Sequence, residues 1–253
     1  MSVHRFYAPN LTHAGDKVRL PDGEAHHLCR VLRLSAGTPV RVFDGRGREH
    51  DATVVRNNSH EASVEIGQQV ETNTEPLVQV TIGVTMLKGR KLDIVVRDAA
   101  MLGVAAITPL RTSRTSCSSS TRDDTHIVDR WRSIAVASCK QCGRALVPTI
   151  GAPVDFATFV DHVAALGGQR MLFIEPAAVV PTPDLIPLRS FQTTPRPPNA
   201  SILIGPEGGW TSEEVIYARD AGFTLVTLGS RTLRADAAPI VALSILRFMW
   251  SDL

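Results

Sequence analysis

The chain has 253 residues, of which 43% are hydrophobic and 21% charged, and its formal net charge is +2. These are the values of an ordinary globular protein that can bury a core without structural metals or disulfides. No apolar run approaches the ~20 residues that cross a bilayer, and the first residues lack the apolar core of a signal peptide. We therefore expect a soluble, cytoplasmic protein with no membrane partner.

Charge is unevenly distributed along the chain. Residues 86–144 contain eleven Lys and Arg but only five Asp and Glu. This local surplus is typical of a surface that faces a polyanion such as RNA. A solvated helical face would have the same composition, and charge alone does not separate the two.

Residues 1–72 have the pattern of a small β-rich unit. Short runs rich in β-branched residues are separated by turn residues and predict strands at 5–7, 17–20, 39–43, 52–55 and 62–66. One helical pattern interrupts them at 24–33. Many short strands with a single small helix favour a compact barrel.

After an apparent linker at 73–77 the pattern becomes strand, helix, strand at 78–85, 92–102 and 104–110, which predicts a parallel sheet. Further strands are expected at 171–175, 201–204 and 223–228. Further helices are expected at about 127–141, 156–166, 212–221 and 237–250. We expect a mobile loop at 111–125 and, because the segment is rich in proline and has little periodicity, a surface excursion at 176–199.

Two loops follow buried strands and stand out. The first, from Gly205 to Gly209, reads Gly-Pro-Glu-Gly-Gly, and the second runs from Leu228 to Ala238. Open α/β sheets bind ligands at the carboxyl ends of their strands, and glycines let the backbone approach a ligand closely. The first loop matches neither a Rossmann fingerprint nor a Walker loop.

Each loop also has a purely structural interpretation. The first would be a tight turn into a helix with a capping box, with Thr211 as N-cap and Glu214 three residues later. The second would be a surface network of arginines in which Asp236 caps the last helix.

The one Cys-x-x-Cys motif, Cys139 to Cys142, lies inside a helical pattern and has no second pair of ligands. We therefore expect ordinary thiols and no metal site.

The two loops, together with three further motifs, resemble the RsmE branch of the SPOUT methyltransferases, which methylates N3 of a uridine in 16S ribosomal RNA. The further motifs are His27–Arg33, similar to His-Leu-x-x-Val-Leu-Arg, Leu102–Pro109, similar to Leu-Gly-Val…Pro, and Gln141–Pro148, similar to Gln-x-x-Arg…Pro.

This resemblance implies an α/β fold. A PUA-like β-barrel for RNA binding would span 1–72, and a trefoil-knotted SPOUT domain with a parallel sheet would span 76–253. It also implies S-adenosyl-L-methionine as cofactor, 16S rRNA within the small ribosomal subunit as partner, and a homodimer through the knotted domains. Matching the family motifs residue by residue gives cofactor contacts at Ile204, Gly205, Pro206, Glu207, Gly208, Gly209, Leu228, Gly229, Ser230 and Leu233.

The catalytic candidates are Arg234, to stabilise negative charge on the uracil, and Asp236, as one of several proton acceptors that stay open beside water and solvent. The candidates for RNA contacts are Arg5, Arg30, Arg33, Lys88, Arg90, Arg114, Gln141 and Arg144.

The segment after the second loop departs from the family pattern. Relatives usually have Arg-x-Glu-Thr-Ala where this chain has Arg234-Ala-Asp-Ala-Ala238. Two alternatives therefore stay open. One is a SPOUT enzyme with another RNA target, such as a ribose hydroxyl or a transfer RNA base. The other is a non-catalytic ribosome assembly factor.

Overall fold

The computed structural model describes all residues except 1–2, 58–60, 74, 116–120, 177–184 and 253. Parts of the loop expected at 111–125 and of the excursion expected at 176–199 lie outside the described residues. The chain divides into two compact units: residues 1–75 with 136–147, and residues 76–135 with 148–253. The first unit thus takes in a segment that the sequence analysis placed wholly in the second domain.

The first unit is built on a curled five-stranded sheet with the order β1-β3-β4-β5-β2. Its strands are β1 (Arg5–Tyr7), β2 (Lys17–Arg19), β3 (Pro39–Phe43), β4 (Glu49–Asn57) and β5 (Ala62–Gln69). All pairs are antiparallel except β1 with β3. Each of the five expected strands is present, and β4 and β5 extend beyond their expected ends.

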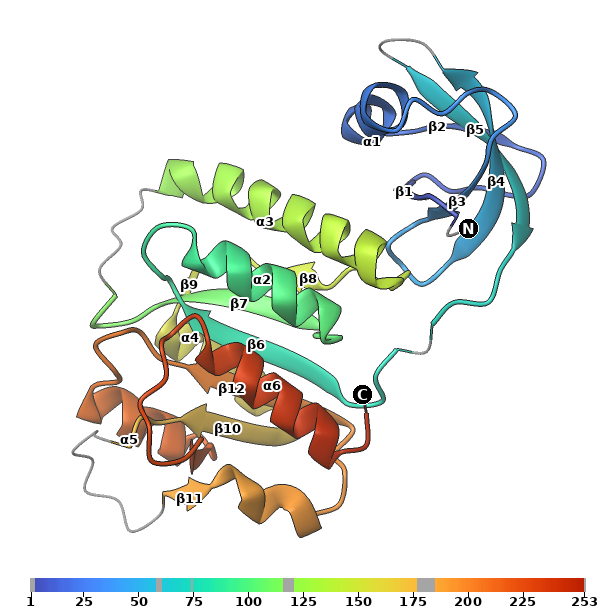
Figure 1. The fold of residues 1–253 in the computed structure, drawn as a ribbon. Coiled ribbons are helices and arrows are strands. Elements are labelled where there is room, and N and C mark those ends of the chain that lie inside the picture. Colours follow the sequence, from blue (N-terminus) through green and yellow to red (C-terminus); the bar gives the residue numbers. More distant parts are fainter. Residues whose placement is uncertain (1–2, 58–60, 74, 116–120, 177–184, 253) are drawn as a thin grey trace. The chain divides into compact units, whose positions relative to one another are not determined.

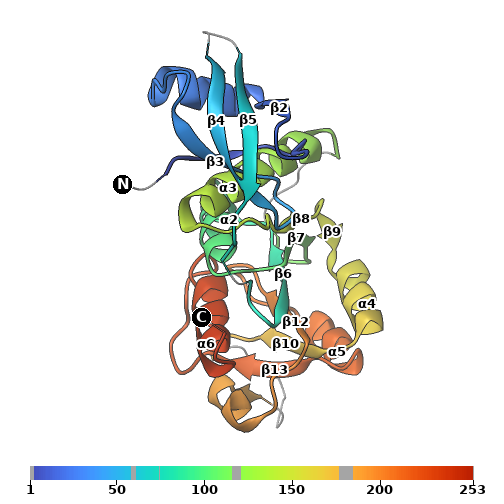
Figure 2. The same ribbon diagram turned by 90° about the vertical axis from the view of Figure 1, so that its right-hand side faces the viewer.

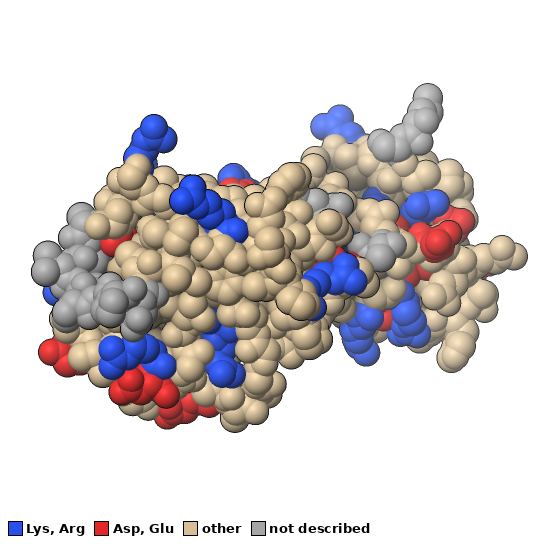
Figure 3. Space-filling model, turned by 90° about the horizontal axis from the view of Figure 1, so that it is seen from below, with Lys and Arg blue, Asp and Glu red and all other residues tan. Residues whose placement is uncertain are grey.

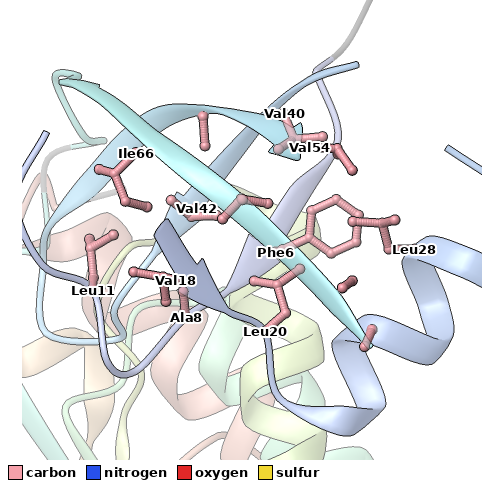
Figure 4. Close-up of a cluster of buried hydrophobic side chains, with 14 residues drawn as sticks. Phe6, Ala8, Leu11, Val18, Leu20, Leu28, Val40, Val42, Val54 and Ile66 are labelled. Atoms are coloured by element: carbon pink, nitrogen blue, oxygen red, sulfur yellow. The ribbon is translucent and has the colours of Figure 1, made fainter. Parts of the chain in front are cut away.

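Buried and exposed residues alternate along these strands, so that one face of the sheet packs around a common core. Figure 4 shows this core, in which Phe6, Leu20, Leu28 and Val42 point toward one another. The helical segment expected at 24–33 begins earlier, at Asp22, and has two parts: α1 (Asp22–His26) continues into a π-helical turn, η1 (His27–Val31). Arg33, in the left-handed region with φ of 53°, ends the helical pattern.

Arg5 is one of the residues that bind the segment 136–147 to the rest of the first unit. Its guanidinium donates to both carboxylate oxygens of Glu49, at 2.9 and 2.8 Å, and to the carbonyls of Cys139, Lys140 and Arg144, at 2.8 to 3.1 Å. These contacts use all five N–H donors of an arginine. The Arg5 side chain, 13% exposed, therefore joins the sheet to the end of a helix, through contacts that span 134 to 139 residues of the sequence.

The second unit contains an eight-stranded parallel sheet with the order β11-β13-β10-β12-β6-β7-β8, with β9 also paired to β7. Its strands are β6 (Gln79–Thr85), β7 (Ala106–Arg111), β8 (Thr149–Ile150), β9 (Val154–Asp155), β10 (Gln169–Phe173), β11 (Ile186–Pro187), β12 (Asn199–Ile204) and β13 (Thr224–Thr227). The helices are α2 (Lys91–Met101), α3 (Thr121–Cys142, shared between the units), α4 (Phe156–Leu166), α5 (Ser212–Asp220) and α6 (Ala238–Met249).

Helices cover both faces of this sheet, α2 and α6 on one and α4 and α5 on the other, as Figures 1 and 2 show. Such cover explains why its central strands are continuous apolar runs. The trefoil knot implied by the family resemblance stays a prediction. None of the helices in the described part of the chain has the length and hydropathy of a membrane span.

Within the surface excursion expected at 176–199, the described residues include β11 and a 3-10 helix, η2 (Leu188–Thr193), which buries Leu188 and Phe191. One sequence expectation in this unit was wrong. Helix α3 begins at Thr121, inside the segment expected to be a loop. Its first turn is polar and carries no helical periodicity that the sequence could reveal.

A buried arginine anchors the C-terminal helix. The side chain of Arg247 is 0% exposed and donates to the carbonyls of Val78, Leu102 and Gly103 and to Asp252. The Asp252 carboxylate also accepts the backbone N–H groups of Leu77 and Val78, at 2.6 and 2.9 Å. This network ties α6 to the start of β6 and to the turn after α2.

We expect Arg247→Leu to lower the free energy of unfolding by about 3 kcal/mol or more, because it leaves a buried carboxylate and three carbonyls without their donor. Urea unfolding followed by tryptophan fluorescence measures this, since Trp131, Trp210 and Trp250 all belong to the second unit. Arg97→Leu, on the exposed side of α2, is the matched control and should change the midpoint little. Equal midpoints for the two variants would contradict the anchoring role.

Candidate active site

The strand register brings three loops to one edge of the sheet. Strand β10 lies between β12 and β13, and Phe173, its last residue, pairs with Ile204 on one side and Val226 on the other. Because the three strands are parallel, the segments that follow Phe173, Ile204 and Thr227 all leave at the same carboxyl edge. The two loops chosen from the sequence are therefore not on neighbouring strands, since β10 separates them.

These three segments line a cavity of about 280 Å³. Most of the predicted cofactor residues line it: Ile204, Gly205, Pro206, Glu207, Gly209, Leu228 and Leu233. Gly208, Gly229 and Ser230 are in the same loops but not in its wall. The sequence analysis missed Phe173, Ile174, Glu175, Pro176, Trp210, Arg231, Thr232, Ala235 and Ala238, while Arg234, a predicted catalytic residue, also lines the cavity.

Glycine is required in the first loop because other groups fill the space beside it. A Cβ at Gly205 would come within 3.0 Å of the Trp210 indole, whose Nε1 donates to the Phe173 carbonyl at 2.9 Å. Gly209 has a φ of 68° and faces the carboxylate of Glu175, which a Cβ would overlap. The loop thus holds its backbone at the cavity wall.

The capping box predicted for the following helix is confirmed. Thr211 accepts the N–H of Glu214 at 3.2 Å, and the Glu214 carboxylate accepts the N–H of Thr211 at 2.9 Å and that of Ser113 at 2.8 Å. The first loop is therefore a turn into a capped helix, as its structural interpretation predicted. This role is compatible with ligand binding by the same loop. The capping box begins directly after Trp210, which lines the cavity.

In the second loop, Arg234 and Asp236 form a two-pronged ion pair. Arg234 donates from Nε and Nη2 to the two Asp236 oxygens, both at 3.0 Å, and the side chains are 73% and 13% exposed, respectively. The alternative in which Asp236 caps the last helix was wrong, because the N-cap is Ala237 and has no side-chain capping bond. Asp236 instead fixes the plane of the Arg234 guanidinium at the cavity.

The other acidic side chains of the cavity differ in their partners. Glu207 accepts a hydrogen bond from Lys91 at 2.7 Å, and this bond, with help from the backbone, holds the pKa of Glu207 below its usual value despite partial burial. Glu175 follows β10 and has no ion-pair partner within the described residues. An acidic residue at the carboxyl end of a predicted buried strand was the signal that could have identified it.

The lining suits a nucleoside-bearing cofactor. Phe173, Ile174, Leu228 and Leu233 offer apolar surface to a flat ring, and the charged side chains offer partners to polar groups. The volume is near the lower end of the range for small-molecule sites. The backbone of Gly229 faces open space, so a ligand can approach it closely. These residues fit S-adenosylmethionine, the cofactor that the family resemblance implies.

Three of the predicted RNA contacts have structural partners within the chain. All donors of Arg5 are used within the first unit, and Arg144, whose side chain is 8% exposed, is bound to both oxygens of Glu75. Arg114 is exposed but donates to the carbonyls of Gly208 and Trp210, at 2.7 and 3.2 Å. Arg5 and Arg144 thus stabilise the first unit, and Arg114 holds the first glycine loop while its exposed side chain stays a predicted RNA contact.

The remaining candidates are exposed: Arg30, Arg33 and Gln141 in the first unit, and Lys88 and Arg90 in the second. Lys88 and Arg90 precede Lys91, the partner of Glu207, so they lie beside the cavity. On the face drawn in Figure 3, basic side chains stand in small groups among uncharged ones, with acidic groups beside some of them. Such spacing favours individual phosphate contacts over a continuous basic stripe.

No cluster of metal-binding side chains occurs among the residues that the structure describes. The Cys139 thiol is buried, which raises its pKa to about 12, and it donates to the Leu146 carbonyl. A thiol in this state is a poor nucleophile, so the Cys-x-x-Cys motif has a structural setting.

Comparison with known proteins identifies the family. Residues 73–247 match the RNA methyltransferase domain, and residues 20–67 match the RNA methyltransferase PUA domain. The chain is 32% identical to the ribosomal RNA small subunit methyltransferase E of Synechocystis sp., over 90% of this chain and 71% of that protein. The chain belongs to this RNA methyltransferase family.

Solved structures agree with this RNA methyltransferase over nearly its full length. A Legionella pneumophila methyltransferase in complex with bound S-adenosylmethionine is 29% identical, with a TM-score of 0.88 over 98% of both chains. The ribosomal RNA small subunit methyltransferase E of Neisseria gonorrhoeae, bound to S-adenosyl methionine, is 28% identical, with a TM-score of 0.83 over 98% of both chains.

Proposed function

We propose that this RNA methyltransferase transfers a methyl group from S-adenosylmethionine to N3 of a uridine in the 16S ribosomal RNA of the small subunit. The observation that carries the proposal is the cavity in which the first glycine loop meets an arginine oriented by an aspartate. The similarity to small subunit methyltransferases E supports the substrate class. An RNA substrate of this kind implies a cytoplasmic reaction.

When bound, the cofactor supplies an electrophilic methyl group on a sulfonium. Uridine N3 carries a weakly acidic proton, and negative charge develops on the uracil ring as that proton leaves. Two of the five N–H donors of Arg234 bind Asp236, so three remain for the uracil. A guanidinium already fixed in place stabilises developing charge without reorganising, which is the efficient form of electrostatic catalysis.

Asp236 is better suited to positioning than to proton transfer. Each of its carboxylate oxygens accepts an N–H of Arg234, so a proton on Asp236 would break the pair that orients the guanidinium. The exposed end of the Arg234 side chain lies open to water. We therefore assign the N3 proton to solvent and the orientation of Arg234 to Asp236.

RNA would reach this edge of the sheet through the exposed Lys88 and Arg90 beside the cavity, with Arg30, Arg33 and Gln141 of the first unit as further contacts. The PUA domain match supports an RNA-binding role for the first unit.

We also propose a homodimer through the second unit, because α2 and α6 pack together and expose the apolar side chains of Ile94, Met101 and Phe248.

The substrate assignment is tested with isolated small subunits that lack the modification. These subunits are incubated with the protein and labelled cofactor, and the methyl group is mapped by mass spectrometry of RNA fragments. We expect label on N3 of one uridine of the 16S ribosomal RNA. Label on a ribose, or on transfer RNA only, would overturn the substrate, and absence of any label would favour a non-catalytic role.

We expect Arg234→Ala to lower the methylation rate constant about 100-fold or more, because the charge that forms on the uracil loses its fixed donor. Cofactor affinity, measured by calorimetry, should change much less. Arg219→Ala removes a comparable exposed Arg–Asp pair on α5 and serves as the control. Near-normal turnover by the Arg234 variant would remove this residue from the mechanism.

Sedimentation equilibrium tests the dimer. The expected mass is twice the 27.4 kDa of one chain, and Phe248→Glu should shift the species toward monomer, because it places a charge on the exposed apolar surface of α6. A wild-type chain that sediments as a monomer at micromolar concentration contradicts the proposal.

A further inference from the structure

Among the acidic side chains of the cavity, Glu175 has a distinct setting. Glu207 is paired with Lys91 and Asp236 with Arg234, whereas Glu175 has no ion-pair partner within the described residues. Its side chain is half-buried and lines the cavity between the two predicted loops, because β10 lies between β12 and β13. A carboxylate therefore occupies the central segment of the three that form the site.

The position of this carboxylate is defined by its neighbours. The residue before it, Ile174, is buried and donates its N–H to the Val226 carbonyl at 2.8 Å. On the other side, the Glu175 carboxylate occupies the space that a side chain at position 209 would take. The absence of a side chain at Gly209 therefore leaves the space that the Glu175 carboxylate fills.

The arginines near the cavity bind groups other than Glu175 or belong to another segment of the chain. The Nη1 atom of Arg114, 3.9 Å from the same Cβ position at Gly209, donates to two loop carbonyls. Arg234 is bound to Asp236, and Arg231 belongs to the second loop. A ligand that fills the cavity removes water from Glu175, which is costly unless the ligand brings hydrogen-bond donors or a positive charge, and a positive charge compensates a carboxylate most strongly.

We propose that Glu175 binds a positively charged group of the cofactor, an assignment that rests on the proposed function. S-adenosylmethionine carries two such groups, the sulfonium and the ammonium of its amino acid end. Either would give the carboxylate a charged partner in a site where water is excluded. Glu175 would then raise cofactor affinity by electrostatic attraction, in addition to any van der Waals contact.

The test is calorimetry of the wild-type chain and Glu175→Gln with three ligands: S-adenosylmethionine, S-adenosylhomocysteine, which has only the ammonium, and 5′-methylthioadenosine, which has neither charge. Glutamine keeps the shape against Gly209 and removes the charge. We expect the variant to bind S-adenosylmethionine about tenfold more weakly, or worse, with unchanged affinity for 5′-methylthioadenosine. Equal weakening for S-adenosylhomocysteine assigns the ammonium, and unchanged affinity for it assigns the sulfonium.

Two outcomes overturn the proposal: an unchanged affinity for S-adenosylmethionine, or an equal loss for all three ligands, which would indicate a contact with the shared nucleoside. Glu213→Gln, the same substitution at an exposed position of α5, is the matched control and should leave all three affinities unchanged. A wild-type chain that binds no S-adenosylmethionine would refute the proposed function itself. Binding by the wild type without a charge-dependent loss in the variant would refute only the role of Glu175.

Discussion

The parallel pairing of β13, β10 and β12 is the constraint on which the site depends. Parallel strands deliver all their carboxyl ends to one edge, and each connection must then cross a face of the sheet before the next strand begins. Three such ends, at Phe173, Ile204 and Thr227, are adjacent here. The segments that follow these three strand ends together form the wall of the cavity. The buried Arg247 network holds α6, the helix that the last of these segments enters.

The basic side chains of this enzyme differ in how many of their hydrogen-bond donors are already bound within the chain. Arg5 uses all its donors inside the first unit, and the buried Arg144 is paired with Glu75 there, so both stabilise this unit. Arg234 is oriented by one carboxylate and keeps donors available beside the cavity. Lys88 and Arg90 remain exposed next to it. In the proposed function, basic side chains would therefore serve stability, transition-state stabilisation and RNA contact, and the difference lies in burial and in the number of donors already used.

Local periodicity was sufficient for the regular elements. Strands Arg5–Tyr7 and Pro39–Phe43 and the helix Phe156–Leu166 have the predicted bounds, because alternation and helical spacing are properties of adjacent residues. The capping box at Thr211 was equally local. The strands β8, β9 and β11 have two residues each, too few to show a period. The burial of Leu188 and Phe191 depends on packing that their proline-rich surroundings do not reveal.

The sequence by itself determined that two loops, one of them rich in glycine, follow buried parallel strands, and its motifs resembled one family of RNA methyltransferases. It did not determine that a third strand end lies between those loops, or that Glu175 enters the site there. Only the tertiary structure decided that, and it also decided that Asp236 orients Arg234 while Arg5 is withdrawn into the first unit. The physical reason is that strand order and side-chain pairing are set by contacts between residues far apart in the chain. The patterns that predict strands and helices, in contrast, depend on residues that are adjacent in the sequence.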